Sequence, residues 1–202
     1  MNLRMRRSIS WIGRAETCDD NDHYARLVFL WIAFNAAYVD EHKPQFAGAG
    51  KHSAERRAFQ TYFRKLVAED RERRIYNALW HKFSGPIRTL MRERSVYGPY
   101  WQHYMGVDGY ADWERWFRGS RRSFLRAFQK SDTPKVLGFV FDRLYVLRNR
   151  LIHGGLTWDS DSNRAQVRDG AAILTFLIPV FIDLMMDDPQ KDWGHPFYPV
   201  VE

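Results

Sequence analysis

Cysteine is nearly absent from this sequence. Cys18 is the only one among 202 residues, which excludes an intramolecular disulfide and any zinc site that needs two cysteine ligands. A lone thiol fits a reducing compartment, so we expect the cytoplasm. The seven histidines are scattered along the chain and lack the helical spacing of paired metal ligands. We therefore expect neither a metal nor another cofactor.

Hydrophobic runs long enough to span a membrane are also missing. The longest apolar stretch, from Ala171 to Met186, contains Pro179 and Asp183 and is shorter than the roughly 20 residues that a span needs. The basic N-terminus, MNLRMRRSISWIG, lacks the continuous apolar core of a signal peptide. We expect residues 171–186 to form a buried helix, and we expect no membrane partner.

Aromatic residues and positive charge are plentiful. With 45% hydrophobic residues, including 8 Trp, 10 Tyr and 14 Phe, the chain can build a sizeable core. We expect one domain over residues 1–202, with 1–18 as an N-terminal arm and 188–202 as a Pro-rich tail. The 31 Lys and Arg against 24 Asp and Glu give a net charge of +7, which favours a polyanionic partner or an ordinary solvated surface.

Helical periodicity dominates the pattern, and no alternating run argues for a substantial sheet. The prediction is an all-α, single-domain bundle of about six to seven helices. Asp19–Asp22 can cap the first strong helix, a role that we favour over Mg²⁺ binding. Residues 95–110 mix Gly, Pro and aromatics and are predicted as an ordered loop. The predicted helices cover residues 23–39, 54–70, 71–83, 86–94, 111–129, 134–152 and 171–186.

One segment resembles a phosphate-binding loop only superficially. The Walker pattern needs a Gly five residues before the Gly-Lys and a Ser or Thr after the Lys. Around AGAGKHS, residues 47–53, these positions hold Gln45 and His52. We therefore predict a loop here and no nucleotide hydrolysis of that type.

The segment RNRLIHGG, Arg148 to Gly155, combines polar and titratable residues at the end of an apolar helix. Gly154 and Gly155 should stop that helix. Asn149 and His153 are four positions apart and share a face, whereas Arg148 lies five positions back and about 140° round. Only a distorted last turn and the long arginine side chain can bring Arg148 near His153.

RNRLIHGG, together with WIAFNAAY over Trp31–Tyr38, resembles the HEPN superfamily of bacterial defence type, close to the Apea-like group, with its Arg-x4-6-His motif. The resemblance implies a helical bundle that dimerises so that two motifs face one cleft. It also implies a metal-independent endoribonuclease in a defence, toxin-antitoxin or stress context, with an antitoxin or regulatory protein as a possible partner. By this likeness Arg148 and His153 match the catalytic arginine and histidine, and Asn149 matches the polar residue after the arginine. Arg150 lies outside the pattern.

RNA supplies its own nucleophile, the 2′-hydroxyl, so cleavage needs a base, an acid and a cation for the phosphorane charge. His153 can act as base or acid, and Arg148 can clamp the phosphate. The expected product is a 2′,3′-cyclic phosphate, from single-stranded RNA or tRNA. Asn35, polar within an apolar helix, can orient Arg148 or Asn149, or serve as a satisfied core amide.

Two alternative functions stay open. The chain can be a non-catalytic HEPN module that binds RNA, a nucleotide or a protein, or a purely structural helical protein.

The aromatic residues between 97 and 110 can stack bases, although core or dimer contact is the commoner role. The basic run RGSRR, Arg118 to Arg122, can face phosphates or be a solvated helix face.

Overall fold

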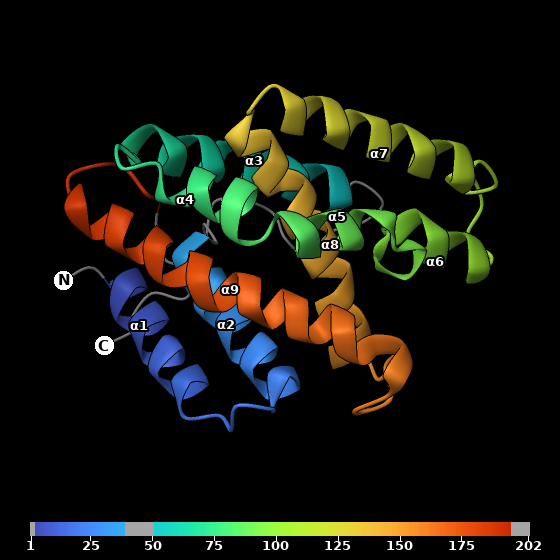
Figure 1. Cartoon of the computed structure of the whole chain (residues 1–202), viewed down its shortest axis with the longest axis horizontal. Helices are drawn as coiled ribbons and strands as arrows, with labels where there is room; N and C mark the ends of the chain where they lie inside the picture. The colour runs from blue at the N-terminus through green and yellow to red at the C-terminus, as the bar shows by residue number, and fades with distance from the viewer. Residues whose placement is uncertain (1–2, 39–50, 195–202) are drawn as a thin grey trace. The chain divides into compact units, whose positions relative to one another are not determined.

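Every regular element in the described residues, 3–38 and 51–194 of the computed structural model, is a helix (Figure 1). The all-α prediction is confirmed for this part of the chain. The expected number of helices is wrong, because nine α-helices are present there, with two short helices of other types. The chain divides into two compact units, Met1–Arg74 with Val167–Glu202, and Ile75–Gln166.

The first unit begins with two packed helices, α1 (Leu3–Glu16) and α2 (His23–Tyr38). The expected N-terminal arm thus contains a helix. The Arg4 Nη1 atom, fully buried, donates to the carbonyl of Ala37 at 2.7 Å, and Ser8 Oγ donates to that of Ala33 at 2.8 Å. These two buried hydrogen bonds to the backbone of α2 fix α1 against it.

Aromatic packing builds the core of the first unit. Phe34 of α2 is fully buried and lies 4.6 Å from the Tyr38 ring and 5.6 Å from the Phe59 ring, centroid to centroid. Phe59 belongs to α3 (Lys51–Glu69), of which the side chains are described from residue 59 onward. Since α2 carries apolar residues on nearly all sides, it forms a central element of this core.

The turn between α1 and α2 uses its acidic residues for capping. The Asp22 carboxylate accepts a hydrogen bond from the backbone N–H of Ala25 at 3.0 Å, as an N-cap does. Arg26 donates to the carbonyl of Cys18 at 2.9 Å and lies 3.8 Å from the Asp20 carboxylate. The predicted capping role is confirmed for Asp22.

The last helix, α9 (Asp161–Asp187), begins ten residues before the predicted start at Ala171. The polar segment from residue 161 still places Asn163, Val167 and Gly170 on one buried side, a helical spacing that composition had obscured. By length and composition α9 could cross a membrane, yet 61% of its most apolar window is buried. A mostly buried core helix passes the same test.

The second unit contains the motif. Its elements are α4 (Arg74–Asn77, starting at the unit boundary), the π-helix η1 (Ala78–Lys82), α5 (Ser84–Arg92), the 3-10 turn η2 (Arg94–Val96), α6 (Gly98–Tyr104), α7 (Trp113–Gln129) and α8 (Thr133–Ile152). The predicted loop over 95–110 is wrong in part, because it contains most of η2 and all of α6. Pro99 near the start of α6 has no N–H to lose there.

Buried aromatics join these elements around α8. Tyr97, Trp113 and Phe117 form a cluster with Tyr100 packed against it. The Arg143 guanidinium of α8, 3% exposed, lies 4.5 Å from the Tyr97 ring centroid. Its Nη2 atom donates to Ser120 Oγ of α7 at 3.4 Å. The cluster therefore ties α7 and the segment before α6 to the helix that carries the motif.

Candidate functional site

Helix α8 presents the motif at its C-terminal end. Asp132 caps its first turn, its carboxylate accepting from the N–H of Lys135 at 3.3 Å, and Pro134 occupies the first turn. The predicted apolar face is buried at Leu137, Val140, Phe141, Leu144 and Leu147, whereas its last predicted member, Leu151, is half-buried. This packing fixes the helix up to the residue before Arg148.

The helix ends in a Schellman motif, as the paired glycines predict. The N–H of Gly155 donates to the carbonyl of Arg150 at 2.6 Å, and that of Gly154 to the carbonyl of Leu151 at 3.3 Å. Gly154 has φ +71°, in the left-handed region that favours glycine. A Cβ at Gly155 would lie 3.2 Å from the Arg150 carbonyl oxygen. Both glycines therefore have a backbone role.

Arg148 and Asn149 are in direct contact. Arg148 Nη1 donates to Asn149 Oδ1 at 2.8 Å, and both residues are half-buried. The guanidinium also lies 5.9 Å from the ring centroid of Tyr145, one turn back. Because Asn149 holds one edge of the guanidinium, the fork of Arg148 is restrained near the helix end.

His153 is the C-cap of α8 and its side chain is exposed. Its backbone N–H donates to the carbonyl of Asn149 at 3.0 Å, which links the two residues predicted to share a face. Within the described residues the imidazole makes no hydrogen bond or ion pair, with Arg148 or any other group. The structure thus pairs Arg148 with Asn149 and leaves His153 open to solvent beside them.

Arg150 has a role that the sequence did not reveal. Its Nη1 donates to the carbonyl of Ser95 at 3.3 Å and its Nη2 to that of Gly155 at 3.5 Å. The guanidinium lies 4.7 Å from the Trp101 ring centroid, and Trp101 Nε1 donates to the same Ser95 carbonyl at 2.7 Å. Arg150 therefore fastens the end of α8 to η2 and α6.

Partial burial of Arg150 also affects its acidity. Desolvation lowers the pKa of this guanidinium from its ordinary value, and the electrostatic influence of Glu93 and then Tyr100 opposes that effect. An arginine remains charged at neutral pH even so. The contact with Trp101 is therefore a cation–π interaction. No sequence signal marked Arg150, since the partners come from residues about 50 positions earlier.

The other predicted contributors fall into different environments. Tyr97 is a core residue at 5% exposure, whereas Tyr104 is 64% exposed and available to a partner. Asn35 is half-buried on α2 in the first unit, and its support of Arg148 or Asn149 stays a prediction. The AGAGKHS segment lies outside the described residues up to residue 50, and the loop prediction is wrong for its last three residues, which begin α3.

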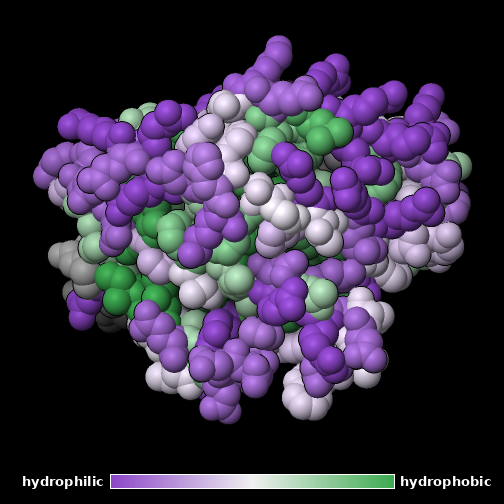
Figure 2. Space-filling view, in the orientation of Figure 1, coloured by the Kyte–Doolittle hydropathy of each residue, from purple (hydrophilic) through white to green (hydrophobic). Residues whose placement is uncertain are grey.

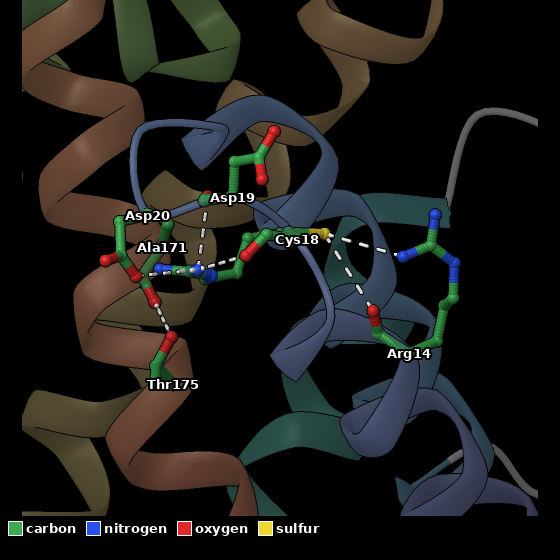
Figure 3. Close-up of polar contacts among 7 residues, drawn as sticks. Arg14, Cys18, Asp19, Asp20, Ala171 and Thr175 are labelled. Carbon is green, nitrogen blue, oxygen red and sulfur yellow. Dashed lines mark hydrogen bonds and ion pairs between the residues drawn. The ribbon is translucent and has the colours of Figure 1, made fainter.

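Metal-binding residues do not cluster in the part of the chain that the structure describes. No group of three or more His, Cys, Asp or Glu side chains there is arranged to hold an ion. Cys18 is a half-buried free thiol whose Sγ lies 3.9 Å from the Arg14 carbonyl (Figure 3).

The candidate site at the end of α8 consists of Arg148, Asn149 and His153, held by Arg150 and the two glycines.

Comparisons with protein-family models, curated proteins and solved structures found no match to this chain.

Proposed function

We propose that the chain is a metal-independent endoribonuclease of HEPN type. The observation that carries the proposal is the end of α8, where an exposed His153 lies next to a hydrogen-bonded Arg148–Asn149 pair. A solvent-accessible imidazole and a restrained guanidinium are the two groups that phosphodiester cleavage through the 2′-hydroxyl requires.

In the proposed reaction, a neutral His153 takes the proton of the 2′-hydroxyl, and the 2′-oxygen attacks phosphorus. The bond from phosphorus to the 5′-oxygen breaks, and a protonated histidine gives that oxygen its proton. The products are a 2′,3′-cyclic phosphate and a 5′-hydroxyl. Arg148 stabilises the charge on the non-bridging oxygens with its planar fork.

A homodimer would supply the second histidine. Two large apolar side chains, one within the motif and one shortly after it in the sequence, support this assembly, because Ile152 is 51% exposed and Trp158 is 76% exposed. Exposed apolar side chains next to a polar site are typical of an interaction surface. We propose that a second copy covers this surface, with its own His153 facing the same cleft, and that an antitoxin or other regulator acts on the assembly.

Cleavage of single-stranded RNA or tRNA in EDTA tests the proposal. We expect His153→Ala to lower the cleavage rate by about 10²–10⁴-fold, the usual contribution of a general acid or base. Arg148→Ala should lower it comparably. His81→Ala is the matched control, since His81 is an exposed histidine of the same unit outside the motif. Equal rates for His153→Ala and His81→Ala would remove His153 from the mechanism.

A second candidate function is RNA binding without cleavage. It is favoured because, among the described residues, the His153 imidazole forms no hydrogen bond with the Arg148–Asn149 pair of the same chain. Salt-sensitive RNA binding with no cleavage of any RNA, tRNA included, would select this function. Substitutions that change stability alone would instead select a structural role.

A further inference from the structure

Helices α5 and α7 carry an unusual excess of arginine. Residues 84–92 of α5 include two arginines and no acidic residue, and residues 113–129 of α7 include five arginines and one glutamate. Both helices belong to the second unit and pack against each other and against α8. Figure 2 shows hydrophilic side chains over α7 with a small apolar patch among them.

Carboxylates neutralise only the first arginines of α7. Arg115 lies 2.7 Å from Asp112, and Arg118 lies 3.6 Å from Glu114. Within the part of the chain that the structure describes, the remaining arginines of α5 and α7 form no ion pair with a carboxylate. They are Arg88, Arg92, Arg121, Arg122 and Arg126.

Three of these side chains line a shallow depression and the other two line the surface that adjoins it; we call the two parts together the arginine groove. Arg88, Arg92 and Arg121 line a depression of about 90 Å³ between α5 and α7. Arg122 and Arg126 line the adjoining surface of α7. Both parts share Leu125, which is 48% exposed. A concave surface of one sign over an apolar floor concentrates the electrostatic potential.

The arginines are spaced and restrained for repeated contacts. Arg88 and Arg92, like Arg122 and Arg126, are four residues apart, so each pair has Cα atoms about 6 Å apart along one helix face. The Arg88 guanidinium lies 5.2 Å from the Phe128 ring centroid, and that of Arg121 lies 5.9 Å from the Phe117 ring centroid. Ring contacts of this kind hold a guanidinium in place and leave its N–H groups for an anion.

The groove also leads towards the motif. Arg92 ends α5, and three residues later the Ser95 carbonyl accepts hydrogen bonds from Trp101 and from Arg150 of the motif helix. A chain of phosphates lying along α5 would therefore approach the end of α8 that carries His153. A flat membrane surface fits a concave groove poorly, whereas a strand with one charge per nucleotide can meet both rows of arginines.

We propose that the arginine groove binds the phosphodiester backbone of single-stranded RNA. The choice of RNA as the polyanion rests on the proposed function. The inference that the groove binds a polyanion depends only on the arginines that lack a carboxylate partner. Phosphate contacts of this kind hold the strand in register without reading its sequence.

Binding to a fluorescent single-stranded RNA, followed by anisotropy, tests the groove. The His153→Ala protein serves as background, so that cleavage does not interfere. Each lost phosphate contact should weaken binding about fivefold at 0.1 M salt, hence roughly 25-fold for Arg92→Gln with Arg122→Gln. The slope of log K against log salt should fall by about 1.4 in magnitude.

The matched control is the double variant Arg115→Gln with Arg118→Gln, which removes the same charge from ion-paired arginines of α7. We expect it to change the affinity by less than about threefold, since those side chains already have carboxylate partners. Equal weakening by both double variants would overturn the groove in favour of a general charge effect. Poly-glutamate or phosphatidylserine vesicles that compete as well as RNA at equal charge would overturn RNA as its ligand.

Kinetics separate this inference from the proposed function. Where the unmutated protein cleaves RNA, the groove variant should raise KM and leave kcat unchanged. Cleavage with an unchanged KM would refute the groove and leave the ribonuclease proposal standing. RNA binding that depends on the groove arginines, without any cleavage, would refute the ribonuclease proposal and leave the arginine groove standing.

Discussion

Arg150→Met provides a sharp test of how the motif is held. Methionine keeps the apolar stem but loses the stacking on Trp101, worth about 1 kcal/mol at a partly buried site. It also loses the hydrogen bonds to the carbonyls of Ser95 and Gly155, which at 3.3 and 3.5 Å are long and worth about 0.5 kcal/mol each. The expected loss is about 2 kcal/mol.

Hydrogen exchange read by mass spectrometry localises this loss. A change of about 2 kcal/mol should speed exchange roughly 30-fold in peptides that cover residues 94–104 and 148–155. Thermal unfolding should begin about 4–8 °C lower if the second unit unfolds as part of the whole chain. Arg150→Lys should recover less than half of the protection, because an ammonium group lacks the planar fork.

Arg115→Met is the control for this measurement. Arg115 pairs with Asp112 at 2.7 Å while its side chain is 68% exposed, so its loss should cost below about 1 kcal/mol. Exchange in the same two segments should not change. Indistinguishable protection in Arg150→Met and Arg115→Met would refute the reasoning that Arg150 fastens α8 to η2 and α6.

Three further predictions concern stability. Gly154→Ala should destabilise the protein by about 1–2 kcal/mol in urea unfolding, because φ +71° is unfavourable for alanine, and an unchanged midpoint would contradict that strain. Asp22→Ala should cost about 1 kcal/mol through the lost cap on the Ala25 N–H, whereas Asp22→Asn should retain most of it. Tyr62→Phe should cost less than about 1 kcal/mol, since its buried hydroxyl donates to the weak acceptor Met185 Sδ at 3.2 Å; a loss above about 2 kcal/mol would show a stronger partner.

Local patterns predicted most of the helices. The apolar face of α8 and the two glycines after it determine where that helix begins and ends, because burial and left-handed backbone are properties of a few adjacent residues. The polar start of α9 is not predicted, because most of its residues are polar and only Asn163, Val167 and Gly170 carry the helical spacing of its buried side. The sequence predicts a loop over residues 98–104 because Gly98 and Pro99 are as typical of turns as of helix starts.

In the candidate site, too, only the features that depend on adjacent residues are predictable from the sequence. Arg148, Asn149 and His153 were found together because they are adjacent in one motif. The structural role of Arg150 is not predictable from the sequence, because its partners Ser95 and Trp101 lie on other elements and no local pattern connects them to it. The arginine groove likewise depends on the pairing of α5 with α7, although the basic run at Arg118–Arg122 gave a partial signal.

We propose that the end of α8 cleaves RNA through the 2′-hydroxyl. The most direct measurement is to incubate the unmutated protein in EDTA with an RNA and with the DNA of the same sequence, and to identify the ends of the products. We predict RNA fragments with 2′,3′-cyclic phosphate and 5′-hydroxyl ends, intact DNA, and no such fragments from His153→Ala. Cleavage of the DNA, RNA products with a 5′-phosphate, or undiminished cleavage by His153→Ala would contradict the claim.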